Sequence, residues 1–598
     1  MQTITQILTK QIEPAFAAAG INSSAPIILV EASRPEFGDF QVNGVMAAAK
    51  LLKTNPRDLA AQVITNLDLS GIADKVEIAG PGFINISLNN QFLSNFLSEL
   101  TLTNKFGATT DKSQTIVVDL SAPNLAKEMH VGHLRSTVIG DSLARIFAYM
   151  GNNVIRQNHV GDWGTQFGML IAYMQEKNTD ANINQLEQHF AILDLEQFYR
   201  EAKVKFDAST EFAEKAREYV VKLQSGDKTT LQYWELFTKE SQKHCDLIYD
   251  KLGIDLGSTK PGGHYFVDNQ VREVSSQCGE SFYNNKLSKI VDKLEESNLI
   301  TVSNGAKCVF FAPGELSGGE ETPFIVQKQD GGYLYASTDL AAIDYRVNTL
   351  YADKIVYVVD ARQSFHFKQL FIVGRKAGFA RAQTELIHSA FGTMMNEDGR
   401  PFKTRDGGTV KLIDLIDEAV IKAKTLVENL HPEWDEKTRY DLANVLAIGA
   451  IKYADLSKNR TSDYVFSFDK MLAFDGNTAP YLMYAYTRIQ GVLRKAAETG
   501  IVMADKVIPV EFAEHKLALH LARFSEILFA TAKECYPHYL CQYLYNLAGL
   551  FMQFYELCPI LKADTTSQQQ SRLKLSEITA QILRVGLDLL GIQTVDRM

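Results

Sequence analysis

The sequence predicts a multidomain α/β protein whose catalytic domain is a doubly wound, Rossmann-like parallel sheet with a helical insertion. Three apolar runs rich in β-branched residues, Ile116–Leu120, Lys354–Val359 and Glu385–His388, have the length and composition of buried parallel strands. The first run is followed by helical spacing of apolar residues, and Phe365–Phe379 between the other two shows the same spacing. Two strand–helix halves around an insertion imply a crevice where the strand order reverses, and ligands bind in such crevices.

Three domains are expected along the chain. Residues 1–108 alternate helical patterns with short strands, as in KVEIAGPGFINISL at 75–88, and predict an α+β domain. Residues 109–415 carry the two half-sheets, with a helical, charged insertion at about 176–305. Residues 416–598 are almost entirely amphipathic and predict an α-helical bundle. Its expected helices are 415–429, 436–452, 478–497, 512–533, 538–557 and 571–590.

The composition is that of a globular protein with large cores. The 598 residues are 46% hydrophobic and 22% charged, and 61 basic residues against 71 acidic ones give a net charge of −10. A nucleic-acid partner would therefore need local basic patches, since the chain as a whole is acidic. Six scattered cysteines without a C-x-x-C pair, no signal-peptide layout and no long apolar run predict a cytoplasmic protein with no membrane span.

The join between the first strand and its helix carries the sequence His130-Val131-Gly132-His133. Residues three apart lie on one face of a helix, so the two histidines project together, and Gly132 removes side-chain bulk between them. A helix N-terminus after a parallel strand offers free N–H groups and partial positive charge to phosphate. The pattern by itself fits three interpretations: a triphosphate cradle, half of a zinc site, or helix surface.

The flanking residues carry a resemblance. The run SAPNLAKEMHVGHLRST at 121–137 resembles the "HIGH" signature of class I aminoacyl-tRNA synthetases, and its PN-x-AK and HLRST flanks resemble the arginyl-tRNA synthetases. GDWGTQFG at 161–168 is also similar to that family. The resemblance implies that arginine and ATP form arginyl-adenylate with Mg²⁺ assisting, and that the arginyl group passes to the 3′-terminal adenosine of tRNA-Arg. It also implies that tRNA must be bound before arginine is activated.

Arginine selection requires carboxylates and hydroxyls arranged for a planar fork of donors. Asp119 ends the first strand, where it can face the crevice, and Tyr335 and Asp339 share a face if their segment is helical. The resemblance assigns the guanidinium end of arginine to these three residues. It assigns the α-amino and carboxylate end to Asn124, His130 and Gln363.

Stabilisation of charge on ATP is expected from the cradle and from a second loop. By resemblance, His130, Gly132 and His133 bind ATP, and the loop at 401–408, PFKTRDGG, takes the place of the family's mobile "KMSKS" loop. Lys403 and Arg405 are the cations of this loop, but the usual second lysine falls on Thr404 or is shifted to Lys403. Lys127 is therefore a candidate for the missing cation. Without its partner motifs this loop would be interpreted as an ordinary basic turn.

Contacts with tRNA are expected from both ends of the chain. Phe83 could stack on an unpaired base and Asn85 could hydrogen-bond it, although a core phenylalanine and a turn asparagine fit equally well. The run GNTAPYLMYAYTR at 476–488 resembles the anticodon-binding helix of the family. It sets aromatic rings beside cations, which suits unstacked bases. The candidates in this part of the chain are Tyr481, Tyr484, Arg488, Tyr555 and Met598.

Two other functions fit part of the pattern. A class I synthetase for another amino acid is disfavoured because two acids in one pocket favour a cationic substrate. A non-catalytic tRNA-binding paralogue is disfavoured by the intact histidine pair and the lysines. The expected partners are tRNA-Arg, L-arginine and ATP. We expect no protein-bound metal site, no membrane partner and a monomer.

Overall fold

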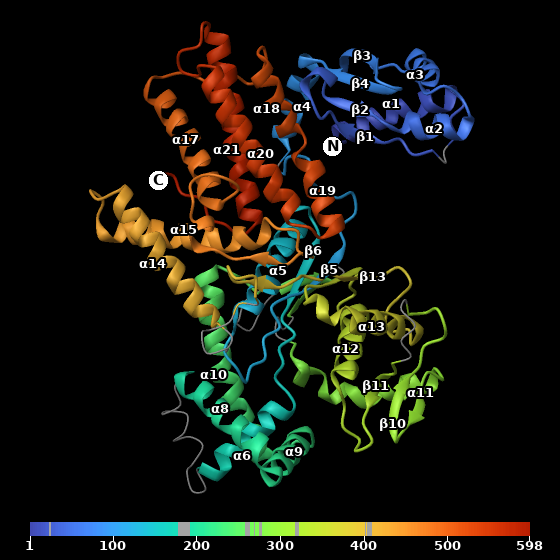
Figure 1. Ribbon diagram of the computed structural model, residues 1–598, viewed down its shortest axis with the longest axis vertical. Helices are drawn as coiled ribbons and strands as arrows, with labels where there is room; N and C mark the ends of the chain where they lie inside the picture. Colours follow the sequence, from blue (N-terminus) through green and yellow to red (C-terminus); the bar gives the residue numbers. More distant parts are fainter. Residues whose placement is uncertain are drawn as a thin grey trace. The chain divides into compact units, whose positions relative to one another are not determined.

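The computed structural model describes residues 1–22, 25–103, 105–177, 192–256, 264–267, 270–273, 278–316, 322–400, 402 and 410–598. The chain forms two compact units (Figure 1). The first contains Met1–Thr109, Phe474–Asp588 and Thr594–Met598, and the second contains Thr110–Ala473 and Leu589–Gln593.

A four-stranded parallel sheet is the centre of the second unit. Its order is β13 (Glu385–His388), β12 (Lys354–Tyr357), β5 (Thr115–Asp119) and β6 (Asn153–Gln157). In register, Asp119 lies opposite both Tyr357 and Gln157, so the last residues of neighbouring strands meet at one edge. Adjacent strands β12 and β5 are fully buried along most of their length, which explains their apolar composition. The predicted strands and parallel sheet are confirmed.

Helices after the strands complete the two halves. α5 (Val131–Tyr149) follows β5, α12 (Tyr335–Asp344) precedes β12, and α13 (Ser364–Lys376) joins β12 to β13. A Cβ atom at Gly140 of α5 would lie 2.3 Å from the Cβ of Leu120, so only glycine lets this helix pack so closely. Minor elements near the strand ends are η3 (Tyr345–Thr349), η4 (Ala361–Gln363), β14 (Met394–Met395), β15 (Tyr464–Val465) and α16 (Phe468–Met471).

The insertion divides into two parts, which are separate clusters in Figure 1. The helical part contains α6 (Thr165–Lys177), α8 (Ile192–Ala208), α9 (Thr210–Gln224) and α10 (Lys228–Leu252) around a small core of its own. The second part contains η2 (Glu280–Lys286), α11 (Leu287–Glu296), β9 (Thr301–Ser303), β10 (Ala306–Val309) and β11 (Phe324–Gln327). Between the two parts in sequence, β7 (His264–Val267) and β8 (Gln270–Glu273) pair with each other. Strands β9 and β10 form a hairpin across Asn304 and Gly305, a residue pair typical of such turns.

Two helices lie in a different unit from the one that the sequence suggested. α14 (Leu412–Leu430) and α15 (Glu436–Leu456) pack against each other and cluster with the parallel sheet, although both were expected in the C-terminal bundle. A buried ion pair, Arg135 Nε to Asp455 Oδ2 at 3.0 Å, ties α15 to α5. Amphipathic spacing shows that a helix has a buried face, but it does not show which neighbour covers that face.

The first unit contains an α+β part and a helical bundle. An antiparallel sheet of order β1 (Leu29–Glu31), β2 (Phe40–Val42), β4 (Phe83–Leu88), β3 (Ala73–Ala79) is joined by α1 (Ile4–Ala18), η1 (Pro35–Phe37), α2 (Gly44–Leu52), α3 (Pro56–Thr65) and α4 (Asn90–Leu102). The bundle contains α17 (Ala479–Glu498), α18 (Phe512–Ala522), α19 (Phe524–Glu534), α20 (His538–Leu557) and α21 (Thr566–Leu589). The predicted helix 512–533 is interrupted at Arg523.

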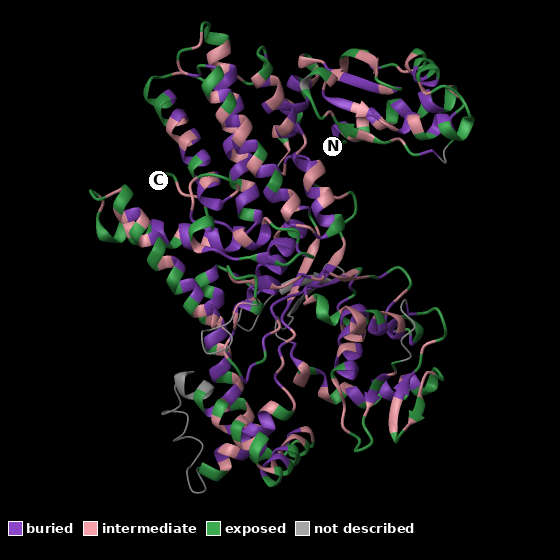
Figure 2. Cartoon of the chain, viewed as in Figure 1, coloured by how far each residue is buried: buried purple, intermediate pink, exposed green. Residues whose placement is uncertain are grey.

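Each bundle helix buries one face and exposes the other (Figure 2). Such amphipathic helices bury their apolar faces by packing against one another. In the described part of the chain, no helix is both long and apolar enough to cross a membrane.

Candidate active site

The turn after β5 is stabilised by hydrogen bonds to α5 and to the residue that follows β6. Ser121 and Ala122 have φ of 71° and 50°, a left-handed conformation that is uncommon for residues other than glycine. The Ser121 N–H donates to Ser136 Oγ at 2.9 Å, and the Ala122 N–H donates to Asn158 Oδ1 at 2.9 Å. These bonds fix where the chain leaves the sheet and where α5 begins.

His130 and His133 cap the N-terminus of α5 together. His130 Nδ1 accepts the Gly132 N–H at 3.0 Å, and His133 Nδ1 accepts the His130 N–H at 3.0 Å. Because both Nδ1 atoms accept, each neutral ring carries its proton on Nε2. The ring centroids are 3.9 Å apart, and a Cβ at Gly132 would lie 2.8 Å from His130 Cε1. The expected pairing of the histidines and the need for glycine are both seen here.

Both histidines are neutral near pH 7. Burial, followed by the charge of Lys127 and then of Arg362, lowers the pKa of His130. Burial and the adjacent His130 lower the pKa of His133 to about 3. The two rings can therefore donate Nε2–H bonds to phosphate oxygens, while positive charge must come from other groups.

Cations surround this cradle. Lys127 is exposed, and its Nζ lies 4.9 Å above the centroid of the Tyr199 ring. Arg362 is exposed and forms a bidentate pair with Asp360, with Nε–Oδ1 and Nη2–Oδ2 distances of 2.9 and 2.7 Å. Lys403 and Arg405, with most of their loop, lie outside the described residues.

Asp339 lies on α12, and two histidines lie beside its carboxylate. His366 Nε2 is 2.6 Å from Asp339 Oδ2, and His159 Nε2 is 3.6 Å from Asp339 Oδ1. Tyr335 begins the helix and exposes 60% of its surface, so its phenol is accessible. The segment predicted to bring Tyr335 and Asp339 to one face is helical. Neither histidine was singled out from the sequence, because each is distant from Asp339 along the chain.

Glu280 is a second acid beside Asp339 that sequence reasoning missed. Burial, and then the charges of Asp162 and Asp339, raise the pKa of Glu280 to about 8, while a backbone bond from Trp163 opposes this shift. A carboxyl with so perturbed a pKa marks a candidate functional site. Its neighbours in sequence give no periodicity or motif that would have identified it.

Asp119 reaches the expected end of β5, but its carboxylate is already paired. Arg346 Nη2 lies 2.9 Å from Asp119 Oδ2, and Arg346 Nε donates to Gln157 Oε1 at 2.7 Å. Arg346 is fully buried in the turn after α12. Among the described residues Asp119 Oδ1 has no hydrogen-bond partner. A substrate guanidinium would therefore have to share this acid with a protein guanidinium.

Asn124 and Gln363 are both exposed near the strand ends. Asn124 pairs with Gly161 in an isolated parallel bridge, and a Cβ at Gly161 would lie 2.1 Å from Asn124 Oδ1. Gln363 directly precedes α13 and follows Arg362. Both positions leave the amide groups accessible to a ligand.

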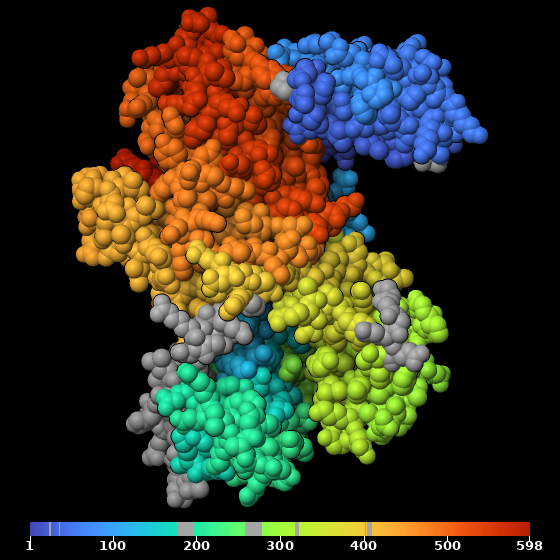
Figure 3. Space-filling view, in the orientation of Figure 1, coloured from blue at the N-terminus to red at the C-terminus, as the bar shows by residue number. Residues whose placement is uncertain are grey.

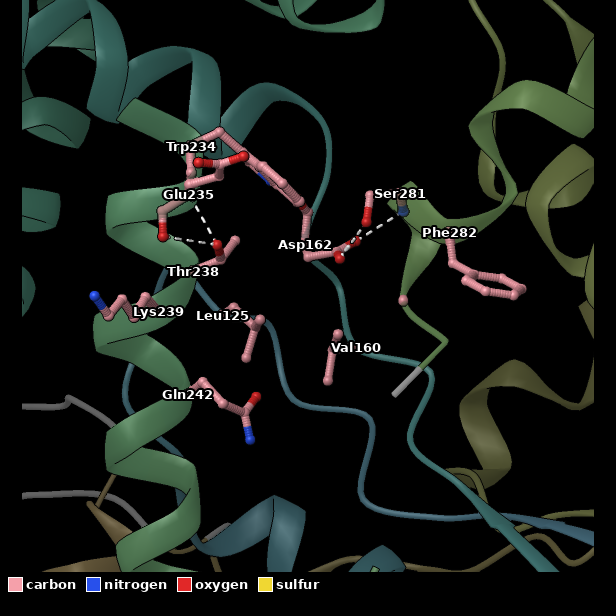
Figure 4. Close-up of a pocket in the computed structure, with 11 residues that line it drawn as sticks. Leu125, Val160, Asp162, Trp234, Glu235, Thr238, Lys239, Gln242, Ser281 and Phe282 are labelled. Atoms are coloured by element: carbon pink, nitrogen blue, oxygen red, sulfur yellow. Dashed lines mark hydrogen bonds between the residues drawn. The ribbon is translucent and has the colours of Figure 1, made fainter. Parts of the chain in front are cut away.

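A cavity of about 490 Å³ is lined by residues that include Leu125, Asp162 and Ser281 (Figure 4). Asp162 forms one wall, where its carboxylate accepts the Ser281 N–H at 2.8 Å and the Ser281 Oγ–H at 2.5 Å. Trp234 of α10 donates to the Asp162 carbonyl at 2.6 Å, so its ring lies against Asp162 (Figure 4). The second unit is recessed between the helical part of the insertion and the segment around α11 and α12 (Figure 3).

The candidates in the helical bundle are brought together. Tyr481, Tyr484 and Arg488 lie on α17, and the Arg488 guanidinium is 4.4 Å from the centroid of the Tyr555 ring on α20. Tyr484 is 41% exposed, so its ring is accessible. Arg494 Nη1 donates to the Asp596 carbonyl at 3.1 Å, which places the tail carrying Met598 beside α17.

The candidates in the α+β part differ from each other. Phe83 begins β4 and is half-buried. Asn85 is only 3% exposed, and its Oδ1 accepts from Gln41 Nε2 at 2.8 Å. The Gln41 side chain therefore occupies the Asn85 amide oxygen, and the contact of Asn85 with a base stays a prediction.

Comparison with known proteins decides the family. The family model described as "tRNA synthetases class I (R), catalytic domain" matches residues 95–468. The models "DALR anticodon binding domain" and "Arginyl tRNA synthetase N terminal domain" match residues 482–598 and 2–88. The chain belongs to the arginyl-tRNA synthetase family. The three matches cover both half-sheets, the bundle from α17 onward and the α+β part.

Relatives and solved structures agree with this membership. The chain is 51% identical over 597 residues to an arginine–tRNA ligase of Laribacter hongkongensis, and 50% identical over 600 residues to one of Chromobacterium violaceum, with both chains covered completely in each case. It is also similar to the crystal structure of the arginyl-tRNA synthetase of Plasmodium falciparum, with a TM-score of 0.82, 30% identity and full coverage of both chains. A Thermus thermophilus arginyl-tRNA synthetase, 23% identical, shares the fold with a TM-score of 0.79. The chain is thus an arginyl-tRNA synthetase family ligase with an ATP-dependent class I catalytic domain.

Proposed function

We propose that this chain activates arginine with ATP at the carboxyl edge of the parallel sheet and then transfers the arginyl group to tRNA-Arg. One observation carries the proposal: the short segment 362–366 serves both halves of the site. Arg362 acts electrostatically on His130 of the cradle, and His366 bonds to Asp339 of the acidic pocket. An amino acid held by Asp339 would thus have its carboxylate directed toward the phosphate cradle.

The acidic pocket is assigned to the guanidinium. We assign this end of arginine to Asp339, Glu280 and the Tyr335 phenol. Asp119 was the expected second acid, but its pairing with buried Arg346 supports a role in holding the strand end. Asn124, His130 and Gln363 are assigned to the α-amino and carboxylate groups. Two acids and a phenol form a fork that suits a planar cation and excludes apolar side chains.

The chemistry requires positioning and charge and no covalent protein group. An oxygen of the arginine carboxylate bonds to the α-phosphorus, and the bond from that phosphorus to the bridging oxygen breaks, which releases pyrophosphate. Nε2–H groups of His130 and His133, with Lys127 and the loop cations Lys403 and Arg405, are proposed to stabilise the developing negative charge. A ribose hydroxyl of the terminal adenosine, the 2′-hydroxyl, then attacks the carbonyl carbon, and AMP leaves.

Mg²⁺ is proposed to enter with the triphosphate. Such an ion is commonly held by substrate phosphates and one or two carboxylates, which does not require a protein cage. Within the described ranges, no group of three or more histidine, cysteine or acidic side chains could hold a metal ion. The chain's own groups at the cradle are donors and cations, and these suit the phosphates themselves.

The first unit is proposed to bind tRNA. Three tyrosines and a cation support this: Tyr484 is exposed, Tyr481 and Arg488 share its helix, and Arg488 lies over the Tyr555 ring. Met598 lies on a tail attached to the same helix. Stacking of unpaired bases on such rings contributes about 1–3 kcal/mol per base. Phe83 is retained as a candidate contact for a loop of the tRNA. We further propose a monomer in the cytoplasm. The six cysteines are buried and none forms a disulfide, which suits a reducing compartment.

The test measures AMP and pyrophosphate turnover with each amino acid, with and without tRNA-Arg. We expect turnover with arginine alone, and only when tRNA is present. Turnover with another amino acid would assign the pocket to a different substrate, and no turnover with any amino acid would indicate a non-catalytic tRNA-binding protein. Arginine turnover without tRNA would contradict only the requirement for tRNA.

A further inference from the structure

The Asp339 carboxylate is contacted by imidazoles from two separate parts of the chain. His366 belongs to the first turn of α13, and its Nε2 is 2.6 Å from Oδ2. His159 follows β6, and its Nε2 is 3.6 Å from Oδ1. The Asp339 side chain is only 20% exposed, so water cannot easily replace these contacts.

His366 is itself fixed by three aromatic rings. It stacks on Phe324 at a centroid distance of 5.8 Å and an interplanar angle of 22°. It meets Phe367 edge-on at 5.6 Å and Tyr335 edge-on at 4.9 Å. The ring therefore has little freedom to rotate, and it touches both Asp339 and Tyr335, two of the groups assigned to the guanidinium.

His159 is held on the opposite side. Its ring lies 5.6 Å from that of the buried Tyr283, with an interplanar angle of 31°. Its Nδ1 is buried and has no hydrogen-bond partner among the described residues. The polar contact of this imidazole is between its Nε2 and Asp339, although its charge also acts on Asp162.

We propose that His366, assisted by His159, is a positioning residue that determines specificity for the planar guanidinium. This inference rests on the proposed assignment of Asp339 to the guanidinium end of arginine. An ionised carboxylate has about four lone-pair sites. Two imidazoles occupy at most two of them and leave the others in fixed directions.

A carboxylate with fixed orientation distinguishes between cations of equal charge. A guanidinium presents two parallel N–H donors in a rigid plane, whereas an ammonium is a compact point charge with freely rotating donors. A carboxylate held in one orientation matches the parallel donors of the guanidinium. It binds the ammonium no more tightly than a mobile carboxylate would. If Asp339 could rotate, it would accept lysine or other cations on nearly equal terms, and the selectivity would fall.

The test uses two variants that separate the hydrogen bond from the ring. His366→Phe keeps an aromatic ring among Phe324, Phe367 and Tyr335 but removes the donor at Nε2. His366→Gln removes the ring but places an amide donor near the former Nε2. Steady-state pyrophosphate exchange on the full chain with tRNA present gives kcat and KM for arginine and for lysine.

We expect His366→Phe to raise the KM for arginine by about 10²-fold, the size of effect that misplacing a reacting or binding group can cause. Its kcat should change much less, and the ratio of kcat/KM for arginine over lysine should fall. His366→Gln should restore most of this ratio. Binding of tRNA-Arg should be unchanged in both variants, which shows that they are folded.

His388→Phe is the matched control. His388 stacks on Phe367 at 4.5 Å, in the same aromatic cluster, but its Nε2 lies 3.0 Å from the Val359 carbonyl and it makes no contact with Asp339. It should leave the arginine-to-lysine ratio unchanged. Equal ratios in His366→Phe and His366→Gln, whether both normal or both reduced, would overturn the inference.

Asp339→Asn distinguishes this inference from the assignment beneath it. If Asp339→Asn leaves the KM for arginine unchanged, the assignment of Asp339 to the guanidinium is wrong, and the role of His366 falls with it. If Asp339→Asn impairs arginine binding but His366→Phe does not, the assignment stands and the positioning role alone is wrong.

Discussion

The proposed nucleotide cradle and the proposed arginine pocket lie at the same edge of one parallel sheet, but they are assembled differently. The cradle comes from a single stretch: β5, its turn and the first turn of α5, where His130 and His133 cap each other's backbone. The pocket draws Asp339 from α12, His366 from α13, His159 from beyond β6 and Glu280 from η2. The cradle therefore depends on local geometry, whereas the pocket depends on how distant segments meet.

The electrostatic properties of the two regions differ as well. Burial makes the cradle histidines neutral, and nearby cations supply its charge. In the pocket, burial and then the charges of Asp162 and Asp339 raise the pKa of Glu280. A ligand with a cationic end and an acidic end, such as an amino acid with a basic side chain, is thus oriented along the strand ends before any reaction.

The largest expected effect concerns Asp119, which the sequence assigned to the pocket and the structure pairs with Arg346. Asp119→Ala should lower the free energy of unfolding by about 3–5 kcal/mol, because it leaves a buried guanidinium without its partner. Urea denaturation of the full chain measures this loss. Replacing both partners, as Asp119→Leu with Arg346→Met, should recover much of it.

The exposed pair Lys437–Asp441 provides a control for Asp119. Asp441→Ala should cost far less, because solvent screens an exposed ion pair. If Asp119→Ala is as stable as Asp441→Ala but loses arginine binding, then Asp119 belongs to the pocket and not to the framework of the sheet.

The next effect tests whether the cradle acts through its outward donors. His133→Asn keeps an acceptor near the Nδ1 position for the His130 N–H but removes the Nε2–H donor. It should lower kcat by about 10²-fold, the cost of losing one preorganised donor, with a small change in the KM for arginine. His133→Ala should show the same kinetic loss and a further destabilisation of about 1 kcal/mol, the usual value of a helix cap. Normal kcat in both variants would limit the histidines to capping.

The smallest effect, taken over one pH unit, is a pH dependence confined to the pocket. Since the pKa of Glu280 is raised to about 8, its carboxyl group is protonated below that pH, and a guanidinium requires the carboxylate. The KM for arginine should fall about tenfold per pH unit as pH rises toward 8 and then level off, as expected for one proton competing with the ligand. The cradle histidines should add no inflection near pH 6.5, because their pKa values are lowered.

Glu280→Gln is the control for this profile. It should remove the dependence of KM on pH while leaving a weaker, constant affinity. A slope that persists unchanged in Glu280→Gln would assign the titration to another group, of which Asp162 is the nearest named candidate because its pKa is also raised by burial.

The sequence by itself determined the elements whose signal is local. The buried strands β5, β12 and β13, the helix after each of the first two, and the β9–β10 hairpin follow from periodicity and turn residues over fewer than about twenty positions. The cradle could be predicted for the same reason, because the strand, the glycine and the two histidines are contiguous in sequence. The flanking motif added the family and its expected ligands.

Only the tertiary structure decided which side chains share the pocket. The sequence spacing of Glu280, His159 and His366 does not relate them to Asp339. The residues around Arg346 likewise give no sign that its side chain forms an ion pair with Asp119. Likewise, the alternation around Asn85 predicts a strand, but only the sheet shows that Gln41 donates a hydrogen bond to the Asn85 amide oxygen. Backbone preferences and amphipathic faces depend on residues that are close in sequence, so they can be predicted from it. Burial and charge pairing depend on which distant segments the packing brings together.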